Sequence, residues 1–175
     1  RDNRFILGIG VGWMKEEFDI YGVDFHRRGK ITDESIEVLR KLWCGDMVEH
    51  HGEHFNFPRV QLSPAPKKFP PIYIGGASEI ALRRAARCGD GYIGAGTAPD
   101  AVAPLLQRLD KLRQEYGRDQ LPFEAMLGVT AMPDRDLFLR LQDDGLQSTV
   151  APPFQYALGK KKSSLDEKKR FMEHF

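Results

Sequence analysis

Short apolar runs alternate with helix-like segments along most of this chain, and this alternation constrains its fold more than any other feature. In these apolar runs, polar residues do not alternate with apolar ones as they do in a strand with one solvent-exposed face. This pattern is expected for strands that are buried on both sides. Such strands are predicted near residues 5–10, 71–75, 91–95, 125–130 and 146–150. Strands that alternate with helices predict βαβ units, and therefore an α/β fold with a parallel sheet.

Helices are predicted between these strands from apolar residues at helical spacing. The first begins at Thr32, with Asp33 and Glu34 in its first turn, where negative charge favours a helix start, and it ends before Gly45. The other predicted helices span residues 78–87, 101–116, 136–143 and 165–175. Because no linker, repeat or low-complexity tract divides the chain, we expect residues 1–175 to form a single domain.

A different pattern at about residues 47–57 predicts a small β-hairpin insertion. It contains His50, His51 and His54, a spacing that resembles a metal-binding motif. On a strand, however, His50 and His51 would point to opposite faces, so we predict no metal site. Pro58 and the prolines that follow predict an extended surface connection after the hairpin.

Composition excludes several classes of protein. The chain has 26 Lys and Arg against 25 Asp and Glu, so no excess of positive charge suggests nucleic-acid binding. No apolar run reaches the roughly 18–20 residues of a membrane-spanning helix, so we expect no membrane association. Its two cysteines, Cys44 and Cys88, have no metal-binding spacing and favour a reducing, cytoplasmic location.

The segment from Gly75 to Ser78 is the sharpest candidate site. Gly75, Gly76, Ala77 and Ser78 join a predicted strand to a predicted helix. Glycines allow a ligand to approach the backbone closely, and the free N–H groups of a helix start bind anions such as phosphate. The alternative is that Ser78 only caps the helix and the glycines only shape the turn.

Two further segments follow neighbouring strands. Gly94, Ala95 and Gly96 follow the next predicted strand and would form one continuous ligand-binding edge with Gly75–Ser78. Alternatively, they form only a tight connection that binds no ligand. Trp13 follows the glycine-rich run at residues 8–12 and could either wall a cofactor pocket or lie in the core. That run does not match the dinucleotide-binding fingerprint, because Trp13 stands where a third glycine is required.

Taken together, these segments resemble the luciferase-like monooxygenase superfamily, and most closely its branch of oxidoreductases that use the deazaflavin coenzyme F-420. The order and spacing of the matching stretches over residues 4–97 carry the resemblance. These stretches are residues 4–13, 25–29 with Asp33 and Glu34, 39–43, the hairpin with Gly52, Phe55 and Phe57, 70–76, and 89–92.

The resemblance implies a partial (β/α)8 TIM barrel in which the five predicted strands correspond to strands four to eight, with the small hairpin as an insertion. It also implies that the first three strands and their helices are absent, so that a complete active site is not expected from this chain alone. By position, Gly75, Gly76 and Ser78 would bind the cofactor phosphate, with Gly94, Ala95 and Gly96 beside it. An acidic residue, Glu79, follows Ser78 as in the bacterial luciferases.

The function implied by the resemblance is an oxidoreductase that transfers hydride between reduced coenzyme F-420 and a small organic substrate. An FMN-dependent monooxygenase that uses O2 is the alternative. Because a cofactor carries this chemistry, the lack of a recognisable catalytic triad is expected, and no catalytic residue is assigned. A non-catalytic half barrel that acts as a subunit or binding module is a third possibility. Exposed strand edges would favour self-association, so we expect a homo-oligomer.

Overall fold

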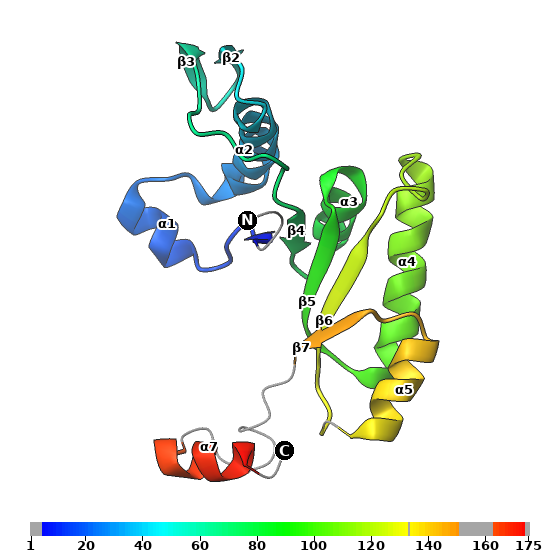
Figure 1. The fold of residues 1–175 in the computed structure, drawn as a ribbon. Helices are drawn as coiled ribbons and strands as arrows, with labels where there is room; N and C mark the ends of the chain where they lie inside the picture. Colours follow the sequence, from blue (N-terminus) through cyan, green and yellow to red (C-terminus); the bar gives the residue numbers. More distant parts are fainter. Residues whose placement is uncertain (1–4, 133, 151–162, 174–175) are drawn as a thin grey trace.

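The computed structural model describes residues 5–132, 134–150 and 163–173. A five-stranded sheet contains β1 (Leu7–Ile9), β4 (Ile72–Gly75), β5 (Gly91–Thr97), β6 (Glu124–Val129) and β7 (Ser148–Val150), and a separate hairpin contains β2 (Val48–His51) and β3 (Asn56–Val60). The α-helices are α1 (Lys15–Tyr21), α2 (Arg28–Trp43), α3 (Glu79–Cys88), α4 (Val102–Glu115), α5 (Arg135–Asp143) and α7 (Leu165–Met172). Figure 1 labels these helices and strands. Short 3-10 helices at Phe25–Arg27 and Pro99–Ala101 lead into α2 and α4.

The five strands of the large sheet are all parallel and stand side by side in the order in which they occur along the chain. At least one helix separates each strand from the next. This order confirms the predicted parallel α/β fold and excludes a Rossmann arrangement, in which the strand order reverses within the sheet. It is the order in which consecutive strands follow one another around the wall of a (β/α)8 barrel.

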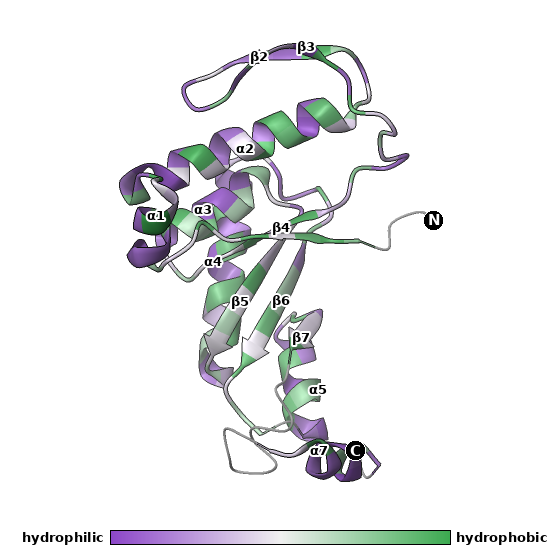
Figure 2. Cartoon of the chain, turned by 90° about the vertical axis from the view of Figure 1, so that its left-hand side faces the viewer, coloured by the Kyte–Doolittle hydropathy of each residue, from purple (hydrophilic) through white to green (hydrophobic). Residues whose placement is uncertain are grey.

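The sheet packs one face against helices. The side chains of Ile72, Ile74, Tyr92 and Leu127 are at most 2% exposed and belong to one apolar cluster with residues of α3 and α4, including Leu109. Figure 2 shows the hydrophobic stretches along β4, β5 and β6 that contribute to this core. Since strand residues alternate between faces, the residues between these positions lie on the opposite face of the sheet.

The strands at the two edges of the sheet are shorter than predicted. β1 covers only Leu7–Ile9 of the predicted 5–10, and β7 covers only Ser148–Val150 of the predicted 146–150. Leu146 is buried in the core cluster just before β7 begins. Self-association through strand edges is not tested by this structure and stays a prediction.

The start of α2 differs from the sequence prediction. The helix begins at Arg28, four residues before Thr32, after a 3-10 turn in which the Asp24 carboxylate accepts a hydrogen bond from the His26 backbone N–H at 2.8 Å. Asp33 and Glu34 therefore lie in the second turn, and the prediction that they favour the helix start by their charge is wrong. Both carboxylates instead bind side chains or backbone groups of other elements.

Glu34 fastens the hairpin to α2. Its Oε1 accepts hydrogen bonds from the Phe55 backbone N–H at 2.8 Å and from His50 Nε2 at 3.0 Å, and its Oε2 accepts one from the His54 backbone N–H at 2.9 Å. Lys41 Nζ lies 3.1 Å from His50 Nδ1. Because an ammonium group can only donate, His50 carries its hydrogen on Nε2 and donates it to Glu34.

The hairpin itself is confirmed, with an antiparallel pairing of β2 and β3 beside α2 (Figure 1). His50 is buried and His51 is exposed, which confirms that they point to opposite faces. β3 continues through Pro58 to Val60, so the extended connection begins later than predicted. Proline is compatible with an edge strand because it lacks only the N–H group.

Replacing Glu34 with glutamine should release the hairpin from α2. A neutral amide offers one acceptor oxygen where the carboxylate offers two, so at least one of the backbone N–H groups of His54 and Phe55 loses its partner. We expect these two amides to exchange with solvent at least about tenfold faster, measured by NMR hydrogen exchange. Glu49→Gln, a change at an exposed hairpin carboxylate, is the control and should leave both rates unchanged.

The same contact should depend on pH. Burial opposes ionisation of Glu34, but the hydrogen bonds from Phe55, His50 and His54 outweigh it and lower the pKa of this carboxyl from the ordinary 4.5. A carboxyl with a lowered pKa stabilises the folded state above its ordinary pKa, and this contribution disappears as the pH falls through the lowered value. We therefore expect the His54 and Phe55 amides to lose protection below about pH 4.5 in the natural protein but not further in Glu34→Gln.

The remaining predicted helices are confirmed within a few residues. Ser78 caps α3, Asp134 caps α5, and Ser164 caps α7 through a capping box with Glu167. The predicted end of the last helix at Phe175 lies outside the described residues. Within the described part of the chain, no helix combines the length and apolar character needed to cross a membrane.

Candidate functional site

A cavity of about 730 Å³ lies at the carboxyl ends of β1, β4 and β5, beside the first turns of α2 and α3. This is the end of the strands at which parallel α/β proteins bind ligands. Its walls consist of Gly10, Val11, Gly12, Trp13, His26, Arg28, Gly29, Gly75, Gly76, Ala77, Ser78, Ile80, Ala81, Arg84, Ile93 and Ala95.

The loop from Gly75 to Ser78 forms one wall, and its shape requires glycine at position 76. Gly76 has a φ of 123°, and a Cβ atom there would lie only 3.0 Å from the Cβ of Ala81. The Tyr92 hydroxyl donates a hydrogen bond of 3.0 Å to the Gly76 carbonyl oxygen. The buried tyrosine thus anchors the loop to the core and fixes the backbone that faces the cavity.

Ser78 is the N-cap of α3, as one of the two interpretations of the sequence predicted. Its Oγ accepts a hydrogen bond from the Ala81 backbone N–H at 3.2 Å. Capping uses the oxygen as an acceptor, so the hydroxyl hydrogen stays available to a ligand. The backbone N–H groups of Glu79 and Ile80, which precede Ala81 in the first turn, have no partner within the helix, and the helix dipole adds positive potential there.

Glu79, the acidic residue at the start of α3, is held away from the cavity. Its carboxylate pairs with Arg83 at 3.0 Å and with Arg108 of α4. The hydrogen bond from Arg108, together with the charges of both guanidinium groups, lowers the pKa of Glu79 despite the opposing effect of desolvation. Glu79 does not line the cavity, so its charge is neutralised outside the space that an anion would enter.

Trp13 and Ala95 lie at the cavity, whereas Gly94 and Gly96 do not. Trp13 is 80% exposed, so of its two interpretations the core position is wrong and the wall position is consistent with the structure. Gly94 faces the helix side, where a Cβ atom would lie 2.7 Å from Leu127. Alternate residues of β5 point to opposite faces, so only one of each adjacent pair can reach the cavity.

Sequence reasoning did not assign a role to the three basic residues of the cavity, His26, Arg28 and Arg84. Arg84 is 5% exposed and pairs with Asp33 through two contacts of 2.7 and 3.3 Å. Because Arg84 comes from α3, His26 from the turn before α2 and Arg28 from the first turn of α2, local sequence patterns do not reveal that they meet. Arg28 gives the cavity a positive charge that the glycine-rich loop alone does not supply.

A cluster of polar side chains lies at the opposite, amino-terminal end of the strands. Glu124 accepts hydrogen bonds from the Tyr73 hydroxyl at 2.5 Å and from Ser148. Burial and the contact with Glu124 raise the pKa of Tyr73 to about 12, and the bonds from Ser148 and Tyr73 lower the pKa of Glu124. Polar residues at this end of barrel strands usually serve stability, so we assign the cluster a structural role.

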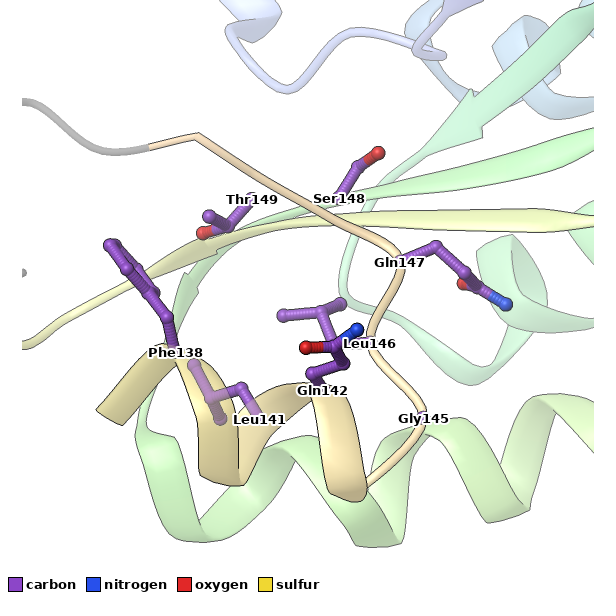
Figure 3. A pocket seen from close by; sticks show the side chains of 8 residues that line it. All are labelled: Phe138, Leu141, Gln142, Gly145, Leu146, Gln147, Ser148 and Thr149. Carbon is purple, nitrogen blue, oxygen red and sulfur yellow. The ribbon is translucent and has the colours of Figure 1, made fainter. Parts of the chain in front are cut away.

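A second cavity, of about 510 Å³, lies between α5 and β7 (Figure 3). Its lining residues are Phe138, Leu141, Gln142, Gly145, Leu146, Gln147, Ser148 and Thr149. None of these side chains is charged, and the cavity contains none of the predicted site residues. The cavity at Gly75–Ser78 therefore remains the stronger candidate. Among the described residues, no three His, Cys, Asp or Glu side chains are grouped so as to hold a metal ion.

Three relatives match most of the chain. An uncharacterised protein of Mycobacterium tuberculosis is 38% identical over 178 residues, which cover 99% of this chain and 60% of that protein. Pyrimidine monooxygenase RutA of Allorhizobium ampelinum is 27% identical over 146 residues, which cover 78% of this chain and 40% of the enzyme. The coenzyme F-420-dependent glucose-6-phosphate dehydrogenase of Segniliparus rotundus is 27% identical over 158 residues, covering 85% of this chain and 46% of the enzyme.

Solved structures show the same fold. A coenzyme F-420-dependent secondary alcohol dehydrogenase, in complex with an F-420–acetone adduct, superposes with a TM-score of 0.64 at 21% identity and covers 96% of this chain and 55% of that enzyme. The chain thus spans about 60% or less of the length of these relatives. Residues 2–146 match the family described as luciferase-like monooxygenase, and the chain therefore belongs to this family.

Proposed function

We propose that this chain forms the cofactor-phosphate end of an oxidoreductase that transfers hydride between reduced coenzyme F-420 and an organic substrate. The observation that carries the proposal is the cavity at the carboxyl ends of the strands, where the Gly75–Ser78 loop opens α3. Membership of the luciferase-like family supports a flavin or deazaflavin cofactor. The relative from Segniliparus rotundus, which is named as F-420-dependent, supports the deazaflavin.

The residues of the cavity fit such a cofactor. Its volume of about 730 Å³ lies within the range of small-molecule sites, and a Cβ atom at Gly10 would have no neighbour within 4 Å, so the wall leaves room for a ligand. Gly75, Gly76, Ala77 and Ser78 would hold the phosphate through backbone N–H groups. When bound, the cofactor supplies the redox chemistry, and the exposed ring of Trp13 would shield it from water.

A monooxygenase that uses FMN and O2 is the second candidate, favoured by the similarity to RutA, which is named as a pyrimidine monooxygenase. Both cofactors carry a phosphate, so the Gly75–Ser78 loop fits either of them. The two candidates differ in the ring that the rest of the site must accept.

Titration of the complete gene product with coenzyme F-420 and with FMN, followed by cofactor fluorescence, tests the proposal. We expect saturable binding of coenzyme F-420, at least about tenfold tighter than that of FMN. This ratio corresponds to a difference in binding free energy of about 1.4 kcal/mol. Tighter binding of FMN would support the monooxygenase candidate instead. If neither cofactor bound, the chain would be better described as a non-catalytic module, and the proposal would be wrong.

A further inference from the structure

Arg28 is a cation of the cavity that contacts no carboxylate among the described residues. Its guanidinium lies 3.6 Å from the centroid of the Phe25 ring. Nε donates to the Gly12 carbonyl oxygen at 3.2 Å and Nη1 donates to the Phe25 carbonyl oxygen at 2.7 Å. These bonds use two of the five N–H groups of a guanidinium. Within the described part of the chain, no Asp or Glu oxygen lies within 4.0 Å of it. The group is thus fixed in place while several donors are unused.

The neighbouring cation, Arg84, differs because its charge is already compensated. It is buried and pairs with Asp33 through both carboxylate oxygens. Its Nη2 also donates to the carbonyl oxygen of Gly29 at 3.3 Å, directly after Arg28 in the chain. Arg84 therefore positions the first turn of α2, and Arg28 is the cation that is free to bind a negatively charged ligand.

The two helices that start at the cavity run in the same direction. Asp33 of α2 contacts Arg84 of α3. Further along both helices, Arg40 of α2 donates a hydrogen bond of 2.7 Å to the carbonyl oxygen of Cys88 of α3. The contacts therefore advance along both helices together. Each residue adds about 1.5 Å along a helix axis.

This register brings Arg28 level with Ser78. Arg28 precedes Asp33 by about 7.5 Å along α2, and Ser78 precedes Arg84 by about 9 Å along α3. Both residues line the cavity. The guanidinium of Arg28 and the free N–H groups at the start of α3 thus face the same end of one space.

We propose that Arg28 is an anion-binding residue that holds the phosphate ester of the ligand from the side opposite the Gly75–Ser78 loop. A planar guanidinium fork can donate two parallel hydrogen bonds to a phosphate, and a charge-assisted bond is about twice as strong as a neutral one. This inference rests on the proposed function, because it takes the anion to be the phosphate of the cofactor.

Inorganic phosphate is the probe for a direct test, with the fluorescence of Trp13 as the signal. Trp43, the second tryptophan of these 175 residues, packs against the core, so Trp43→Phe leaves Trp13 as the only tryptophan among them. In this background, Arg28→Met should weaken phosphate binding about tenfold or more, as expected for the loss of a charge-assisted hydrogen bond. Arg28→Lys keeps the charge without the fork and should lose less.

Arg27→Met is the matched control. Arg27 is adjacent in sequence, but its guanidinium pairs with Glu53 at 3.0 Å and does not line the cavity. We expect its affinity for phosphate to stay within about twofold of the parent, because an exposed charge outside the site contributes little. An equal loss in Arg27→Met and Arg28→Met would mean that only the overall charge matters, and would contradict the proposal.

The failure of this inference can be distinguished from failure of the proposed function. If Gly76→Val abolished binding of phosphate and of coenzyme F-420 while folded Arg28→Met and Arg28→Lys bound both normally, Arg28 would not be a ligand-binding residue, although the loop site would stand. If none of the three changes altered binding, both the loop site and Arg28 would be excluded. Circular dichroism spectra and thermal midpoints identify any variant that has lost its fold.

Discussion

Gly76→Val is expected to weaken the binding of the cofactor and of phosphate by about a hundredfold or more. At a φ of 123°, a non-glycine residue is strained, and its Cβ would lie 3.0 Å from Ala81. A branched side chain would also cover the N–H groups at the start of α3, which the anion must reach. The dissociation constants are measured by fluorescence titration of the complete gene product.

Two variants separate this effect from general damage. Gly117→Val also places valine at a positive φ, 63°, but outside the cavity, so it should reduce stability without reducing affinity. Ser78→Ala should be milder than Gly76→Val, since it removes the cap of α3, at about 1 kcal/mol, and one donor to the ligand. Unchanged affinity in a folded Gly76→Val variant would show that the loop does not bind the phosphate.

Asp33→Asn is expected to lower the free energy of unfolding by about 2–3 kcal/mol. The change leaves the buried Arg84 guanidinium without a carboxylate and also removes the contact of Asp33 with Arg87 at 2.7 Å. Breaking a fully buried pair typically costs about 3–5 kcal/mol, and Asp33 is one-third exposed, which reduces the expected loss. Urea denaturation followed by circular dichroism measures the change.

The exposed pair of Lys15 and Asp19 provides the control. Asp19→Asn breaks an ion pair in which both side chains are more than half exposed, so the expected loss is far smaller than that in Asp33→Asn. Combining Asp33→Leu with Arg84→Met should recover much of the stability, because an apolar pair leaves no buried charge. A loss in Asp33→Asn no larger than that in Asp19→Asn would contradict the importance of the Arg84 pair.

The sequence was sufficient to predict the sheet and the loop at Gly75–Ser78, because both depend on local patterns. A buried strand, a glycine turn and a capped helix are each encoded within about ten consecutive residues. The start of α2 was wrong because Asp33 and Glu34 resemble helix-start residues, whereas their partners are distant: Arg84 is 51 residues away from Asp33 in sequence. Local charge patterns cannot distinguish these two uses of a carboxylate.

The same reasoning explains what was missed at the site. The wall that contains Arg28 and Arg84 forms only when the start of α2 packs beside α3, and no local pattern indicates that contact. The position of Gly94 was predicted as part of the ligand-binding edge, yet the alternation of β5 turns it toward Leu127. Predicting which residue of a glycine-rich strand end reaches the ligand requires the register of the strand, which is fixed by its pairing with the neighbouring strands in the folded protein.

The attachment of the hairpin to Glu34 bears on how this fold can be shortened or redesigned. Residues 47–57 look like a removable insertion in sequence, because β2 and β3 pair only with each other among the described strands. Deleting them would nevertheless remove all three groups that donate to the Glu34 carboxylate, which is largely buried. In a shorter version of the protein, water would replace these partners and the face of α2 that the hairpin covers would be exposed, so the hairpin cannot be removed without redesigning that face.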